Sequence, residues 1–179
     1  MKFHPSLVKS AFISPMGPMT LAATDAGLAG VWFDGQRHHP DLTDCPVNDQ
    51  HPVLVKAKQQ LTDYFAGRRN HFDVVLDING GTIFQQSVWH ALLKIPPGQT
   101  TSYGDIGRQI GNPAAVRAVG SAVGRNPVSI IVPCHRVLGA DGSLTGYAGG
   151  LDRKTALLKL EHSLERSLER SRPATSKTA

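Results

Sequence analysis

The stretch that decides the fold is Val128-Ser129-Ile130-Ile131-Val132-Pro133-Cys134-His135-Arg136-Val137. Its first five residues form a nearly continuous apolar run, which predicts a buried strand. Pro133 has no backbone N–H to donate to a sheet, so we expect the strand to end there. The sequence therefore predicts that Cys134 lies at the edge of a hydrophobic core, immediately before His135.

The Cys134-His135 pair is a candidate nucleophile and base. Thiolate is the nucleophilic form of cysteine, and a nearby imidazole helps to form it near neutral pH. Successive side chains of an extended chain point to opposite faces. His135 can therefore activate Cys134 only if the chain turns after Pro133 or if a water molecule bridges the two side chains. The alternative interpretation of this cysteine is a small buried hydrophobic residue.

Length and composition describe an ordinary globular protein. The 179 residues suffice for one domain or two small ones, with 40% apolar and 18% charged residues. No segment is long and apolar enough to span a bilayer, and the N-terminus lacks the pattern of a secretory signal. The two cysteines, Cys45 and Cys134, lie in different contexts and do not suggest a disulfide. We expect a cytoplasmic protein with reduced thiols and no membrane partner.

Positive charge is concentrated in the second half of the chain. Residues 1–81 have a net charge of −1, residues 82–161 of +4, and residues 162–179 of +2. A basic half that carries a candidate nucleophile favours a polyanionic partner such as nucleic acid. A solvated basic face is the alternative.

The first half is predicted to be rich in strands, with one helix. Strands are expected at residues 19–23 and 28–33, joined by a hairpin turn, and at residues 72–78. Pro52 is expected in the first turn of a helix that runs to about residue 66, with Gly67 after its end. Asn79-Gly80-Gly81 then interrupts the pattern, and we place a domain boundary after residue 81.

The second half is predicted to be mainly helical. Thr82 and Gln85 are expected to form a capping box before a helix that ends by Pro96, and Ser102 with Asp105 is expected to open a short helix in a similar way. Asn112 and Pro113 are expected to begin a third helix, which runs to residue 124. The last two helices match a helix-turn-helix pattern, although two helices packed in a core would have the same signature.

The third helix has an unusual outward face. A helical wheel places Val116, Val119 and Val123 on the buried side. The opposite side carries small residues and one arginine, namely Ala114, Ala118, Ser121 and Arg117. Such a surface suits close approach to a narrow groove of DNA, with one side chain able to enter the base stack. Close packing against another helix is the alternative.

Taken together, the motifs resemble the O6-alkylguanine-DNA alkyltransferase (methylated-DNA–protein-cysteine methyltransferase) family. The match covers residues 82–161 closely, through the segments 81–89, 101–103, 111–120, 126–127, 133–137, 146–150 and 157–158. The resemblance implies an α/β (α+β) protein with an RNase H-like sheet and helix domain at residues 1–81. A DNA-binding alkyltransferase domain with a helix-turn-helix and a short strand leading to Cys134 would follow at residues 82–162, and then a tail at residues 163–179.

The resemblance also implies the reaction and its catalytic residues. Cys134 would take the alkyl group from O6-alkylguanine in DNA, and also from O4-alkylthymine, in a single irreversible turnover without a cofactor. His135 would act as base through a water molecule, and Glu161 would orient the imidazole. Glu161 lies here in Leu160-Glu161-His162-Ser163, whereas the family commonly has His-Glu-Gly.

The same resemblance implies how DNA is bound after the damaged base leaves the stack. Arg117 would fill the vacated space, Tyr103 would contact the neighbouring phosphate and the guanine ring, and Asn126 would lock the turn before Cys134. The remaining contacts to substrate or DNA would come from Ala115, Ala118, Ser121, Val137, Tyr147 and Ala148. We expect a monomer that binds double-stranded DNA through the minor groove with little sequence specificity.

Three features of the sequence bear on alternative functions. His38, His39 and Cys45 lack a recognisable zinc spacing, so we expect no metal site. A Cys-His-Glu hydrolase would need an oxyanion hole and would turn over repeatedly. A helix-turn-helix DNA-binding regulator would need no reactive cysteine.

Overall fold

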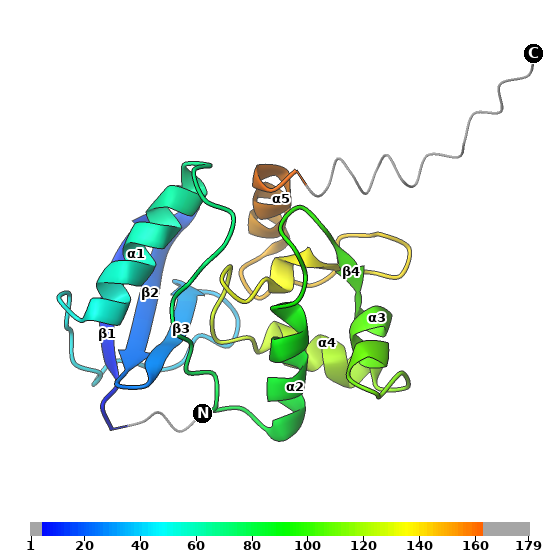
Figure 1. Ribbon diagram of the computed structural model, residues 1–179, viewed down its shortest axis with the longest axis horizontal. Coiled ribbons are helices and arrows are strands. Elements are labelled where there is room, and N and C mark those ends of the chain that lie inside the picture. The colour runs from blue at the N-terminus through cyan, green and yellow to red at the C-terminus, as the bar shows by residue number, and fades with distance from the viewer. Residues whose placement is uncertain (1–4, 163–179) are drawn as a thin grey trace, which may run out of the picture.

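The computed structural model describes residues 5–162 of the chain. A sheet with one helix forms one half of the molecule, and a group of helices forms the other half (Figure 1). The segment between α1 and α2 passes along the junction of the two halves. The predicted α/β class is therefore confirmed, with the sheet in the N-terminal half.

The sheet is antiparallel, in the order β1-β2-β3, and consists of β1 (Val8–Ser14), β2 (Gly17–Thr24) and β3 (Gly27–Phe33). The register pairs Val8 with Ala23 and Ser14 with Gly17. The sequence predicted β2 and β3 but not β1. The fully buried positions of β1 are Ser10 and Ser14, so no apolar alternation marks this strand.

The turn between β2 and β3 requires glycine at its end. Gly27 has a φ of 152°, and a Cβ there would lie 2.6 Å from the carbonyl oxygen of Val75. Because Gly27 has no Cβ, the segment 72–78 can lie directly beside the start of β3. The prediction of a strand at 72–78 was wrong, because the segment pairs with β3 only at Leu28, through bonds to Val75 and Asp77.

Helix α1 (Pro52–Phe65) covers one face of the sheet (Figure 1). It begins at Pro52, as predicted, and Gly67 follows its end with a φ of 70°. Leu54 and Leu61 on its inner side are fully buried. The inner side of the helix therefore belongs to the same hydrophobic core as the sheet.

The C-terminal half contains α2 (Ile83–Leu92), α3 (Tyr103–Gln109), α4 (Val116–Gly124) and α5 (Leu151–Leu160). Both predicted capping boxes are present, at Thr82 with Gln85 and at Ser102 with Asp105. Two short strands, β4 (Thr101–Ser102) and β5 (Val137–Leu138), pair in parallel. Helices α2, α3 and α4 pack against one another.

Helix α4 begins later than predicted. Its first residue is Val116, with Ala115 as N-cap, because Asn112 belongs to the turn that ends the preceding helix. The backbone N–H of Asn112 donates to Gly107, and its carbonyl accepts from Ala115. Val116 is 43% exposed, so its predicted place on the buried side was also wrong.

The apolar run 128–132 is buried but is not a continuous strand. Val128 makes a single bridge to Val31 of β3, and the chain then turns so that Val132 N–H donates to the carbonyl of Val128. Ile130 has a φ of 74°, which is rare for a β-branched residue. The run does not form a sheet strand because its backbone groups bond within the turn and to the side chain of Asn126, which contacts both Val128 N–H and the carbonyl of Val132.

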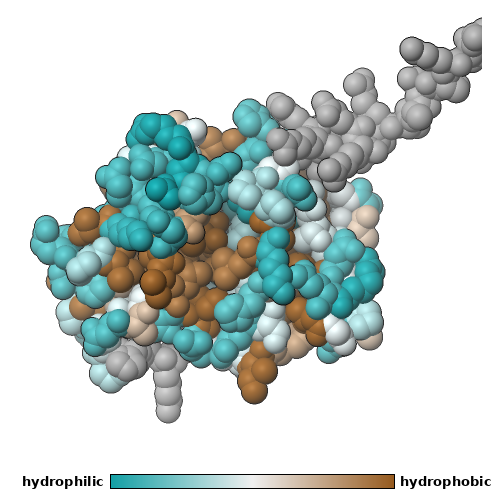
Figure 2. All heavy atoms as spheres, viewed as in Figure 1, coloured by the Kyte–Doolittle hydropathy of each residue, from teal (hydrophilic) through white to brown (hydrophobic). Residues whose placement is uncertain are grey.

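The two halves share one hydrophobic core, which extends from Leu21 and Val31 to Val132 and Leu157. Figure 2 shows hydrophobic side chains gathered over the junction between them. A shallow groove there is lined by Phe72, Val74, Leu76, Ile95, Ile131 and Pro133, among others. None of the helices within residues 5–162 is long and apolar enough to cross a membrane.

Candidate active site

Cys134 begins a tight turn that follows the buried run. A 3-10 turn, η1 (Cys134–Arg136), starts directly after Pro133, and the thiol residue is 5% exposed. Arg136 N–H donates to the carbonyl of Pro133 at 3.0 Å. The sequence required a turn after Pro133 for His135 to act directly on Cys134, and the chain does turn there.

Asn126 holds this turn from inside. Its amide nitrogen donates to the carbonyl of Val132 at 2.8 Å, and its oxygen accepts from Val128 N–H at 3.0 Å. The same nitrogen lies 3.0 Å from the Sγ atom of Cys134. The bonds to main chain were expected, but the contact with the thiol was not. Asn126 therefore both fixes the backbone and offers a hydrogen bond to a developing thiolate.

His135, Arg136 and Glu161 form a buried polar cluster behind the cysteine. His135 is fully buried, and its Nε2 atom lies 2.9 Å from Oε1 of Glu161. Arg136 donates to both carboxylate oxygens, from Nε to Oε2 at 2.7 Å and from Nη2 to Oε1 at 2.9 Å. Nδ1 of His135 has no hydrogen-bond partner within the described part of the chain. The imidazole is therefore oriented by Glu161 at one nitrogen and able to accept a proton at the other.

Burial disfavours the charged forms of Cys134, His135 and Glu161, whereas hydrogen bonds and nearby opposite charges favour them. Burial raises the pKa of Cys134, against the hydrogen bond from Asn126 and the charge of Lys154. Burial likewise lowers the pKa of His135, against the effect of Glu161. For Glu161, burial is outweighed by hydrogen bonds from His135 and Arg136, which hold the pKa of its carboxyl well below its usual range. These shifts favour a neutral thiol at Cys134, a neutral imidazole at His135 and a carboxylate at Glu161.

A cavity of about 240 Å³ opens onto Cys134. It is lined by Arg37, His38, Tyr103, Gly120, Ser121, Val123, Gly124, Cys134, Gly146, Tyr147 and Ala148. Four of the predicted substrate residues, Tyr103, Ser121, Tyr147 and Ala148, therefore surround the thiol. The hydroxyl of Tyr103 donates to the carbonyl of Thr145 at 3.4 Å. A cavity this small fits one planar group rather than an extended chain.

The other predicted DNA-binding residues lie outside this cavity. Arg117 and Ala118 are exposed on the outer face of α4, as the helical wheel predicted, beside Ser121, which lines the cavity, and Ala115 is the half-buried N-cap of the helix. Val137 is fully buried in β5. The cavity is thus bordered by an exposed helix face made of small residues and one arginine.

The sequence did not point to Lys154, which is fully buried in α5. Its ammonium donates to the carbonyls of Val137 at 2.6 Å and Thr145 at 2.7 Å. These bonds tie together the two segments that border the cavity, and burial lowers the pKa of Lys154 to about 8. Because Lys154 lies among ordinary polar residues of an amphipathic helix, no local pattern distinguishes it from a solvated lysine.

Arg37 was not predicted either. It belongs to the N-terminal half, yet it lines the cavity, and its backbone N–H donates to the carbonyl of Ala148 at 3.0 Å. Only tertiary structure brings the loop after β3 to this position.

Two of the three candidate zinc ligands, His39 and Cys45, make other contacts, and the third, His38, lines the cavity at Cys134. His39 Nδ1 lies 2.7 Å from the carbonyl oxygen of Pro40, and the thiol of Cys45 lies 3.4 Å from the carbonyl oxygen of Leu7. No group of three His, Cys, Asp or Glu side chains suited to a metal occurs within residues 5–162.

Comparison with known proteins identifies both halves of the chain. The family model for the ribonuclease-like domain of 6-O-methylguanine DNA methyltransferase matches residues 7–78, and the model for its DNA binding domain matches residues 83–163. The first match agrees with the predicted RNase H-like domain.

Individual relatives agree with these models. The methylated-DNA–protein-cysteine methyltransferase of Mycobacterium tuberculosis is 53% identical over 150 residues, which cover 84% of this chain and 89% of that protein. The corresponding protein of Methanosarcina acetivorans is 52% identical over 152 residues, covering 85% and 96%. The crystal structure of Mycobacterium tuberculosis OGT in complex with DNA has a TM-score of 0.81 and 51% identity, covering 87% of this chain and 93% of that one. The chain therefore belongs to the methylated-DNA–protein-cysteine methyltransferase family.

Proposed function

We propose that this protein repairs DNA by transferring the alkyl group of O6-alkylguanine, and of O4-alkylthymine, to Cys134. The sulfur forms a bond to the alkyl carbon as the bond between that carbon and O6 breaks. The electron pair of the broken bond passes to the guanine, which takes up a proton and leaves as the ordinary base. The thioether is stable, so each molecule acts once.

The observation that carries this proposal is the position of Cys134. The thiol lies in a cavity of about 240 Å³, with Asn126 hydrogen-bonded to its sulfur and the His135–Glu161 pair behind it. The proton of the thiol passes through a water molecule to Nδ1 of His135, and the nearby carboxylate of Glu161 stabilises the imidazolium. Asn126 stabilises the thiolate as it forms.

The substrate base enters the cavity after it leaves the stack. Tyr103, Tyr147 and Ala148 line this cavity, and backbone groups of Val137 and Ala148 read the edge of the base. Arg117 on the exposed face of α4 occupies the gap in the duplex. Ala115, Ala118 and Ser121 allow the helix to approach the minor groove closely.

We also propose a division of the chain into two domains. Residues 1–81 form an RNase H-like domain and residues 82–162 form the DNA-binding transferase domain, and the protein acts as a cytoplasmic monomer without metal or cofactor. The predicted tail at 163–179 lies outside the described residues.

The number of methyl groups bound per protein molecule distinguishes the proposed function from the alternatives. Protein is incubated with an excess of duplex DNA that carries radiolabelled O6-methylguanine, and protein-bound label is measured at completion. We expect one methyl group per protein molecule and none with Cys134→Ala. Repeated turnover would favour a Cys-His-Glu hydrolase, and sequence-specific binding without transfer would favour a DNA-binding regulator.

A further inference from the structure

The carboxylate of Glu161 has a hydrogen-bond donor from the N-terminal half of the protein. The hydroxyl of Tyr64, in α1, donates to Oε1 of Glu161 at 2.7 Å. The two residues are 97 positions apart in the sequence. Tyr64 is 2% exposed and the side chain of Glu161 is 3% exposed, so the bond is made out of contact with bulk water.

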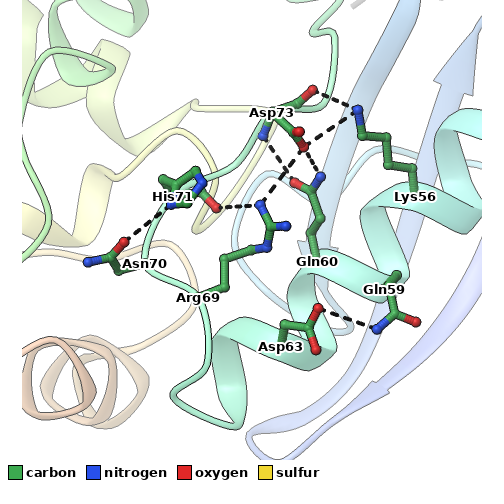
Figure 3. Close-up of polar contacts among 8 residues, drawn as sticks. All are labelled: Lys56, Gln59, Gln60, Asp63, Arg69, Asn70, His71 and Asp73. Atoms are coloured by element: carbon green, nitrogen blue, oxygen red, sulfur yellow. Dashed lines mark hydrogen bonds and ion pairs between the residues drawn. The ribbon is translucent and has the colours of Figure 1, made fainter.

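Tyr64 is held firmly from its own side. Its ring packs against Phe72 and Phe65, at centroid distances of 5.4 Å and 5.5 Å. Figure 3 shows the polar contacts that fasten the segment after α1 to that helix. In these, the amide of Gln60 pairs with both the backbone N–H and the carboxylate of Asp73. Tyr64 is therefore held on α1 by its ring contacts and by the segment that is hydrogen-bonded to that helix.

Glu161 stands at the end of its helix, with its backbone N–H donating to the carbonyl of Leu157 at 3.0 Å. It is the C-cap of α5, and the next residue, His162, has a φ of 57°. A hollow of about 430 Å³ borders it, and both Tyr64 and Glu161 line this hollow. Arg136 holds the carboxylate from one side. On the side of the hollow, the hydroxyl of Tyr64 adds a further donor to Oε1, beside the contacts from His135 Nε2 and Arg136 Nη2. It stands where water would otherwise reach that oxygen.

We propose that Tyr64 is a positioning residue for the alkyl transfer: its hydroxyl holds Oε1 of Glu161 against Nε2 of His135 and excludes water from that oxygen. The inference rests on the proposed function, because it assigns Tyr64 to the same relay. No bond is formed or broken at Tyr64. Burial, and the adjacent Glu161 charge, raise its pKa well above the usual value, so the hydroxyl remains a donor throughout.

The test compares Tyr64→Phe with the wild type in the reaction with free O6-benzylguanine, which requires neither DNA binding nor base flipping. Removal of the hydroxyl leaves the ring packing intact but lets Glu161 shift and admits water. We expect the rate to fall about tenfold, equivalent to about 1.4 kcal/mol. We also expect the pH midpoint of the reaction to rise, because the imidazolium is less well stabilised.

Two further variants distinguish positioning from general stability. Phe72→Leu loosens the packing of the Tyr64 ring but keeps its hydroxyl, so its pH midpoint should equal that of the wild type. In a Glu161→Gln background, Tyr64→Phe should cause little additional loss, because the hydroxyl acts through the carboxylate.

Three results would overturn the inference: wild-type rate and pH profile in Tyr64→Phe, an equal shift in Phe72→Leu, or a full tenfold loss added to that of Glu161→Gln. Failure of the proposed function is a different result. In that case the wild-type protein itself would not react with O6-benzylguanine or with O6-methylguanine in DNA.

Discussion

At the scale of single residues, the proposed chemistry uses side chains whose roles could be inferred from the sequence to different degrees. Cys134 and His135 lie in the segment 133–137 that resembles the family, and the structure brings His135 and Glu161 together at 2.9 Å. No role was inferred from the sequence for Tyr64 or Lys154. Each is an ordinary helical residue whose partner is set only by how α1 and α5 pack on the rest of the molecule.

Substitution of Arg117 should affect base flipping but not the alkyl transfer step. Arg117→Ala should slow repair of O6-methylguanine in duplex DNA by roughly tenfold or more, because flipping costs a few kcal/mol that the arginine partly offsets. Free O6-benzylguanine should react at nearly the wild-type rate, since Arg117 does not line the cavity. Single-turnover rates with both substrates provide the measurement. Equal losses on both would show that Arg117 supports the pocket or the fold instead.

At the scale of elements, local signals predicted helix starts better than they predicted strands. The capping boxes at Thr82 and Ser102 are local hydrogen-bond patterns, and both are present. The apolar runs at 72–78 and 128–132 are extended or buried, but neither becomes a strand. Whether such a run pairs depends on distant partners, here Leu28 and Val31, and the sequence of the run contains no information about them.

The outer face of α4 predicts how the protein binds undamaged DNA. Ala118 and Ser121 offer no bidentate contact to bases, so affinity should depend on phosphates and fall steeply with salt. Scrambling the sequence that flanks the lesion should change the binding free energy by less than the roughly 1–3 kcal/mol of one specific base contact. Fluorescence anisotropy at several salt concentrations measures both effects. Strong preference for one undamaged sequence would contradict this account.

At the scale of the whole molecule, the two halves are joined through the active site as well as through the core. The Tyr64–Glu161 bond and the contact between Arg37 and Ala148 both cross the junction. The domain boundary after residue 81 stays a prediction, made because Asn79-Gly80-Gly81 interrupts the sequence pattern. The contribution of the N-terminal half to the site was not predictable, since it comes from tertiary packing.

The unfolding free energy at low pH should depend on the buried carboxylate of Glu161. The pKa of Glu161 is lower in the folded protein than its usual value of 4.5, so protons bind preferentially to the unfolded chain as the pH falls. The stability that ionised Glu161 contributes is present above pH 4.5 and is lost below it, by up to about 1.4 kcal/mol per pH unit. The difference in unfolding free energy between the wild type and Glu161→Gln should therefore narrow below pH 4.5. Urea titrations at several pH values measure it, and a constant difference would contradict the assignment.

The most direct test of the central claim is a peptide map of the protein after reaction with duplex DNA containing O6-methylguanine. If Cys134 is the acceptor, mass spectrometry should find one added methyl group on the peptide that contains Cys134. The peptide that contains Cys45 should be unchanged, although Cys45 is the more accessible thiol. A methyl group on Cys45 with Cys134 unmodified, or loss of the methyl group from DNA with no modified peptide, would contradict the account.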